Sequence, residues 1–122
     1  MDIPKKGLQT IDLEKLNKYF GDDRQTLIEF MELFISQSKE YVETFTESVR
    51  NKNFEEVTKQ AHKLKATYAN LGINTAYELL SQIEYLDNKS EKYNELLKLF
   101  FEFKNIHIQA EIEALQIIES NK

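Results

Sequence analysis

The sequence contains no cysteine, one proline and only three glycines among its 122 residues. Without cysteine the chain can form neither disulfide bonds nor thiolate metal sites. The single proline is Pro4, so no proline interrupts the chain beyond its first few residues. Because proline and glycine are the residues that most disfavour helix interiors, their scarcity allows long helices over nearly the whole chain.

Long apolar runs are missing as well. The N-terminal stretch MDIPKKGLQTIDLEKL has no uninterrupted apolar segment. It therefore predicts neither a signal peptide nor a membrane span, and we expect a cytoplasmic protein that does not bind membranes. The balance of 16 basic against 21 acidic residues argues against nucleic-acid binding.

Apolar residues recur at intervals of three and four, and no alternation of period two is sustained, which predicts an all-α fold. We expect a short helix near 12–20 and four long helices, over about 23–51, 54–71, 74–87 and 90–120. Four amphipathic helices with short connections predict an antiparallel up-down four-helix bundle, to which the short N-terminal helix is an extra element.

The ends of these helices carry recognisable signals. Asp22 and Asn53 are the predicted N-caps of the second and third helices, and Gly72 is the predicted terminator of the third. The length of the chain fits one domain. We expect residues 1–10 to be an N-terminal tail and residues 11–122 to form the helical bundle domain.

The third helix places a histidine away from its core face. Successive residues turn by about 100°, so His62 falls about 130° from the centre of the apolar sector. The imidazole should therefore face solvent. Small side chains beside it, Ala66 and Ala69, leave room for a large partner. The core sector consists of Phe54, Val57, Ala61, Leu64, Tyr68 and Leu71.

Two lysines flank this histidine at helical spacing. Lys59 and Lys65 lie three residues before and after His62. Their charge disfavours the imidazolium form, which leaves a neutral nitrogen nucleophile. The same charges can attract a phosphoryl group and stabilise it during transfer. The alternative interpretation is a surface histidine without a role.

The second histidine serves as a comparison. His107 lies on the apolar stripe of the last helix, so we expect a core or rim histidine with a local hydrogen-bond partner. Neither histidine has the neighbours of a catalytic triad or a metal site, and neither kind of site is predicted. The stripe comprises Leu96, Phe100, Phe103, Ala110 and Ala114.

The segment AHKLKATYANLG, residues 61–72, resembles the signature of histidine-containing phosphotransfer (HPt) domains: Ala-His-x-Leu-Lys-Gly, several small residues, then Leu-Gly. The upstream stretch from Phe30 to Val57 and the downstream LLSQIEYL are also similar to the family, so the resemblance covers about residues 12–118. One position departs from the pattern: Ala66 stands where the family usually has glycine. The matching residues are Ala61, His62, Leu64, Lys65, Ala69, Asn70, Leu71 and Gly72.

The resemblance implies a four-helix bundle whose exposed histidine carries a phosphoryl group between receiver-domain aspartates in a phosphorelay. His62 would be the acceptor and Lys65 the flanking cation. The chain would be a phosphocarrier without turnover of its own, not an enzyme, and would need no cofactor, because Mg²⁺ belongs to the acidic pocket of the receiver.

The expected partners are response-regulator receiver domains and a hybrid histidine kinase, with the chain itself a monomer. Two alternatives remain open: a histidine-phosphorylated N-terminal domain of a chemotaxis-type kinase, and a helical adaptor in which His62 is dispensable. The expected receiver-docking surface comprises Thr58, Lys59, Ala66, Ala69 and Gly72.

The last helix carries a second apolar strip, although a bundle helix needs only one apolar face. We expect the N-terminal segment to cover this strip through Ile11, Leu13, Leu16 and Phe20. Self-association is the alternative, because contiguous exposed apolar patches often mark protein contacts. The strip consists of Leu97, Phe101, Ile108, Ile112 and Leu115.

Overall fold

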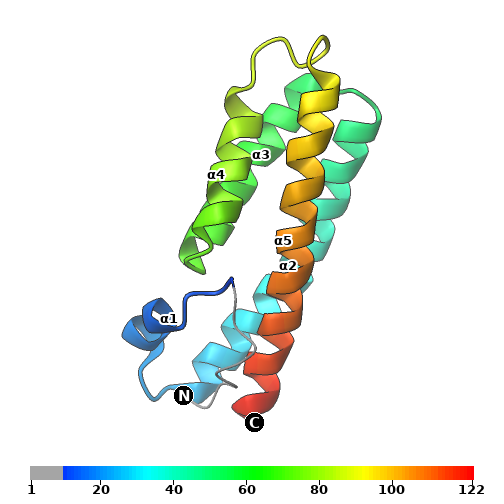
Figure 1. Cartoon of the computed structure of the whole chain (residues 1–122). Coiled ribbons are helices and arrows are strands. Elements are labelled where there is room, and N and C mark those ends of the chain that lie inside the picture. Colours follow the sequence, from blue (N-terminus) through cyan, green and yellow to red (C-terminus); the bar gives the residue numbers. More distant parts are fainter. Residues whose placement is uncertain (1–9) are drawn as a thin grey trace.

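The computed structural model describes residues 10–122, which form helices and no strands, so the all-α prediction is confirmed (Figure 1). The predicted tail lies outside the described residues except for Thr10. The predicted helices match the observed ones to within three residues at each end. The helices are α1 (Leu13–Phe20), α2 (Arg24–Arg50), α3 (Phe54–Asn70), α4 (Asn74–Tyr85) and α5 (Tyr93–Ser120).

Side chains cap three of these helices. Asp12 caps α1, and Asn53 caps α3 as predicted, accepting a hydrogen bond from the Glu56 amide at 3.3 Å. The predicted cap of α2 was one residue early. Asp23, not Asp22, accepts hydrogen bonds from the amide and the hydroxyl of Thr26, because the turn after α1 delays the first helical residue to Arg24.

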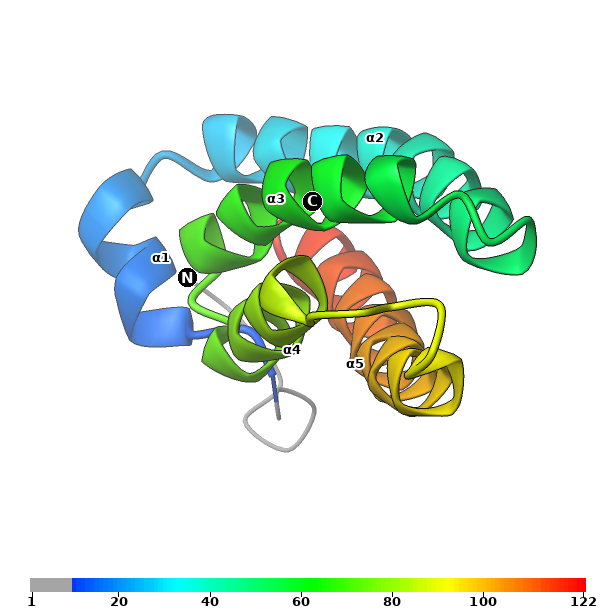
Figure 2. The same cartoon turned by 90° about the horizontal axis from the view of Figure 1, so that it is seen from above.

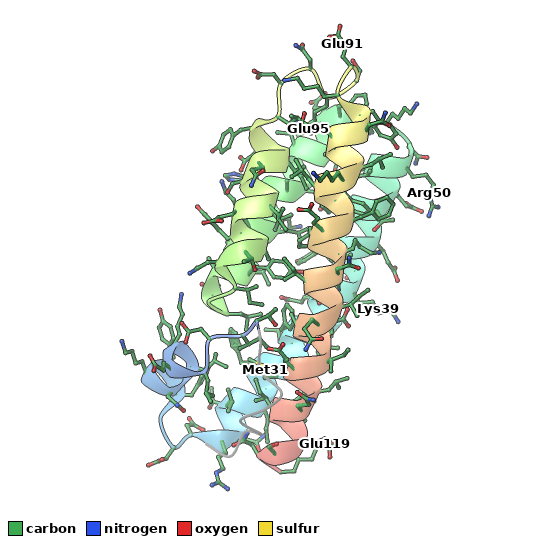
Figure 3. The ribbon with its side chains drawn as sticks, in the orientation of Figure 1. Met31, Lys39, Arg50, Glu91, Glu95 and Glu119 are labelled. Atoms are coloured by element: carbon green, nitrogen blue, oxygen red, sulfur yellow. The ribbon has the colours of Figure 1, made fainter. Side chains whose placement is uncertain are left out.

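The four long helices surround one core. The helix α2 packs against α3 and α5, and α4 packs against the same two helices (Figure 2). The predicted inward residues of α3 and α5 are buried, with Phe54 half-buried at the start of α3. In Figure 3, Met31 of α2 lies within the molecule, whereas Lys39 and Arg50 project from it.

The core includes a chain of three hydrogen-bonded polar side chains. His107 is buried, and its Nδ1 lies 2.7 Å from the Tyr68 hydroxyl, while its Nε2 lies 2.5 Å from Oε1 of Glu111. Burial raises the pKa of Tyr68, so its hydroxyl stays protonated and donates to Nδ1. The imidazole then donates from Nε2 to the Glu111 carboxylate. The prediction of a buried histidine with a local partner is confirmed.

The burial of His107 predicts that the stability of the protein depends on pH. Burial lowers the pKa of His107 below its ordinary 6.5, and the opposing effect of Glu111 does not cancel it. As the pH falls, His107 therefore takes up a proton at a higher pH in the unfolded chain than in the folded protein. The contribution of His107 to the stability of the folded state is complete above about pH 6.5 and is lost as the pH falls toward the folded-state pKa. The free energy of unfolding in urea should fall more between pH 7.5 and pH 5.5 for the parent than for His107→Gln. An equal fall in the two proteins would contradict this account.

A buried carboxylate fixes the N-terminal segment. Glu113 of α5 is fully buried and accepts hydrogen bonds from the amides of Thr10, at 3.1 Å, and Ile11, at 2.9 Å. The amide of Asp12 in turn donates to the carbonyl of Leu71 at 3.0 Å. Residues 10–12 thus connect α5 with the end of α3, and α1 then packs against α2 (Figure 1).

The predicted cover of the second apolar strip is therefore wrong. Glu113 lies about 140° around α5 from Ile108, counting 100° per residue, so the segment attaches to a different side of the helix. Ile11 and Leu16 are buried in the core instead and do not shield the strip. Leu97 is half-buried. The exposed fractions of the other four residues are 58% for Phe101, 51% for Ile108, 45% for Ile112 and 53% for Leu115.

Candidate functional site

His62 projects from the middle of α3 with 68% of its side chain exposed. Its neighbours Ala61 and Leu64 are completely buried, so the helix is fixed in rotation by its core face. The solvent-facing position predicted from the helical period is confirmed.

A carboxylate on the next helix holds both the histidine and Lys65. Glu84 of α4 places Oε2 2.7 Å from Nδ1 of His62 and Oε1 2.6 Å from Nζ of Lys65. Because a carboxylate only accepts hydrogen bonds, the neutral ring must donate from Nδ1, which leaves Nε2 with the lone pair. Within residues 10–122, no hydrogen bond or ion pair involves that Nε2.

The carboxylate is charged at neutral pH. Burial acts to raise the pKa of Glu84, but hydrogen bonds from Lys65 and then His62 outweigh it, and the net pKa lies below the ordinary value. The hydrogen bond between Lys65 and Glu84 also raises the pKa of Lys65. Only 10% of the Glu84 side chain and 14% of the Lys65 side chain are exposed, so the ion pair is largely covered.

Aromatic rings complete the surroundings of Lys65. Its ammonium lies 5.2 Å from the ring centre of Tyr85 and 5.8 Å from that of Tyr77, both on α4. Lys65 is therefore held at the junction of α3 and α4. Lys59 has a different partner, Glu55, at 3.7 Å on the exposed surface. The two lysines that look equivalent in the sequence have different environments.

Sequence reasoning missed Glu84. The acid lies 22 residues after His62, inside the quoted LLSQIEYL segment. A usable signal was present, because α3 and α4 are antiparallel neighbours joined at Gly72 and Ile73. Residues equally distant from such a turn lie level with each other. His62 is eleven residues before Ile73 and Glu84 is eleven after it.

The other predicted docking residues lie at different depths. Ala66 is exposed one turn after His62. Thr58 is half-buried, and its hydroxyl donates to the Phe54 carbonyl at 3.1 Å. Ala69 is also half-buried, and Lys15 of α1 donates from Nζ to its carbonyl at 2.6 Å. The open surface beside the imidazole is thus centred on Ala66 and bounded by Lys15.

Gly72 belongs to the turn and not to the open surface. It has a positive φ of 71°, and its amide donates to the Ala69 carbonyl while the Ile73 amide donates to the Tyr68 carbonyl. These two bonds close α3 in the arrangement that glycine favours. A β-carbon at position 72 would overlap Cβ of Asp12, so the N-terminal segment occupies the space beside it.

An apolar depression lies between α1, α2 and the end of α3. One cavity of about 320 Å³ is lined by Tyr19, Phe20, Phe30 and Asn70. An adjoining cavity of about 180 Å³ shares Phe30 and Asn70 and extends to Leu33. We call the surface formed by Tyr19, Phe20, Phe30 and Leu33 the α1–α2 groove. The groove adjoins α3 through Asn70, one turn beyond Ala66. Tyr19 and Leu33 were not predicted from the sequence, because neither belongs to a core stripe.

Within residues 10–122, no three histidine or acidic side chains are grouped so that they could hold a metal ion. None of the helices described here combines the length and the apolar character needed to cross a membrane.

Comparison with known proteins gives one match. The family model of the Hpt domain matches residues 29–117, which is more than half of the chain and includes both His62 and Glu84. No curated protein and no solved structure matches the chain.

Proposed function

Since the chain belongs to the Hpt domain family, whose members carry out histidine phosphotransfer in phosphorelays, we propose that His62 receives a phosphoryl group from a receiver-domain aspartate and passes it to a second receiver domain. One observation supports this role above the others. The imidazole side chain is 68% exposed, while a mostly buried carboxylate holds it at Nδ1. This geometry presents a nucleophilic nitrogen in a fixed orientation.

In the proposed transfer, the Nε2 lone pair of His62 attacks the phosphorus of the aspartyl phosphate. The bond between phosphorus and the aspartate oxygen breaks, and the aspartate leaves as a carboxylate. The ring gains positive charge as the new P–N bond forms, and the Glu84 carboxylate lies 2.7 Å from Nδ1–H, where it stabilises that charge. Attack by a second receiver aspartate reverses the step.

Lys65 has a different proposed role from the one expected from the sequence. Its ammonium is bound to Glu84, so we assign it to positioning that carboxylate. Because Lys65 and Glu84 neutralise each other, the carboxylate can lie beside His62 without repelling an incoming phosphoryl group as strongly as an unpaired acid would.

The receiver domain is proposed to dock over Ala66 and the α1–α2 groove. Ala66 adds little bulk beside the imidazole, and the groove offers exposed apolar side chains next to it. Thr58 and Lys59 extend this surface toward the start of α3. The Mg²⁺ of the reaction is proposed to lie in the acidic pocket of the receiver.

Three further features belong to this proposal. Each of the four long helices packs against two others, in the order α2, α3, α4, α5 and back to α2, and the connections are short. Both facts support an antiparallel up-down bundle. The chain acts as a phosphocarrier without turnover of its own. A hybrid histidine kinase in the cytoplasm supplies the phosphoryl group through its receiver domain.

Incubation with a ³²P-labelled phosphoreceiver domain tests the function. The chain should acquire label that is lost in acid and kept in alkali, as expected for phosphohistidine, and the receiver should lose the same amount. A folded chain that binds receiver domains but never acquires label would instead be a helical adaptor.

Replacing Glu84 with glutamine should slow the transfer by roughly 10- to 100-fold, because the amide can still accept from Nδ1–H but carries no charge. The affinity for an unphosphorylated receiver domain should not change, since Glu84 is mostly covered. Rapid-quench measurement of label transfer would provide the rate.

The matched control for Glu84→Gln is Glu78→Gln, which makes the same substitution at an exposed position of α4. It should transfer at the parent rate. If both variants transfer at the parent rate while their melting temperatures stay unchanged, the charge of Glu84 does not contribute to the transfer.

A further inference from the structure

The exposed strip of α5 follows the spacing of a helix–helix seam. Phe101, Ile108, Ile112 and Leu115 are separated by seven, four and three residues, which places them on one line along the helix. At 1.5 Å per residue this line extends about 21 Å. Each of these side chains is about half exposed, and the described N-terminal residues pack elsewhere.

The charges beside the strip indicate what it fits. Lys104 and Glu111 lie on the same side of the strip, about 40° and 60° from Ile108, and they are seven residues apart with opposite signs. A second copy of α5 running antiparallel, with its two-fold axis near residues 107 and 108, would bring each Lys104 level with Glu111 of the other copy.

The same register matches the apolar residues. Phe101 becomes level with residue 114 of the second copy, and it therefore packs between Ile112 and Leu115 of that copy. The two Ile108 side chains meet at the axis. A parallel arrangement would instead place Lys104 and Glu111 against the opposite flank of the second copy, where Asn105 and Gln109 carry no charge to pair with them.

We propose that this strip is a homodimer interface in which two copies of α5 pack antiparallel. The interface is isologous, so each copy contributes the same residues. It also leaves His62 accessible, because α3 and α5 lie diagonally across the ring of four helices and meet on the core side of α3, through Tyr68 and His107, whereas His62 faces solvent (Figure 2). The proposal does not depend on phosphotransfer.

Sedimentation equilibrium of the full chain over a range of concentrations tests the interface. The apparent mass should rise from 14.4 kDa toward about twice that value. Ile108→Glu should remain at the monomer mass, because two carboxylates would meet at the axis, and its melting temperature should stay near the parent value. Glu43→Gln, an exposed change on α2, should dimerise like the parent. A monomer at every concentration, or a dimer that Ile108→Glu leaves intact, would overturn the proposal.

Disulfide cross-linking tests the orientation, since the chain has no native cysteine. Oxidation of an equimolar mixture of Phe101→Cys and Leu115→Cys should give the mixed disulfide dimer in excess over either symmetric one. Predominantly symmetric dimers of Phe101→Cys would show a parallel arrangement and overturn the antiparallel assignment.

Discussion

Replacing His62 with glutamine should abolish phosphoryl acceptance and change the free energy of unfolding by less than about 0.5 kcal/mol. Glutamine has no nucleophilic ring nitrogen, so no P–N bond can form. The small effect on stability follows from the exposure of the side chain and from the ion pair between Glu84 and Lys65, which the substitution leaves in place. Label transfer from a phosphoreceiver domain and urea unfolding measure the two quantities.

The control for this experiment is His107→Gln, which removes the other histidine of the chain. This variant should still acquire label, because His107 is buried and hydrogen-bonded to Tyr68 on the core side of α3. Label on folded His62→Gln, or loss of label in folded His107→Gln, would place the acceptor elsewhere and reject the proposed phosphotransfer through His62.

Replacing Gly72 with alanine should lower the free energy of unfolding by about 3 kcal/mol. The φ of 71° costs a side-chain-bearing residue about 1–2 kcal/mol, and overpacking typically adds about 1–3 kcal/mol. The overlap is with Cβ of Asp12, whose backbone is itself bonded to Leu71, so the segment cannot move without breaking that bond. Urea unfolding would measure the loss.

Gly21 offers a control without a side-chain contact. It also has a positive φ, 53°, but no atom lies within 4 Å of the position that a β-carbon would occupy. Its ψ of −121° lies outside the left-handed helical region, so Gly21→Ala should lose only a conformational part, about 1–3 kcal/mol. A loss at Gly72 of no more than the conformational part, about 1–2 kcal/mol, would show that the contact with Asp12 does not contribute to stability.

The sequence predicted the helices and the exposure of His62 because both depend on local periodicity. Each long helix has one apolar stripe, and a residue far from that stripe faces solvent in almost any packing of the helices. The caps were predictable for the same reason, and the error at Asp22 arose because two adjacent aspartates are equally good caps.

Features that depend on how separate helices meet do not follow from the periodicity of one helix. Glu84 is one of many acidic residues until the antiparallel pairing of α3 and α4 is used to count equal distances from their turn, which brings it level with His62. Glu113 belongs to no predicted polar site, yet it determines where Ile11 attaches and leaves the α5 strip exposed. The α1–α2 groove likewise exists only once α1 is folded against α2.

The bond between Glu113 and the N-terminal segment also affects the order of events during synthesis. Helix pairs that are adjacent in the chain can form while translation proceeds, but Ile11 and Glu113 are separated by 102 positions. Until the ribosome has released α5, the amides of Thr10 and Ile11 have no Glu113 to bond to. The packing of α1 against α2 and the bond from Asp12 to Leu71 need only the first three helices, so a nascent chain can assemble the α1–α2 groove before the segment that precedes α1 is fixed to α5.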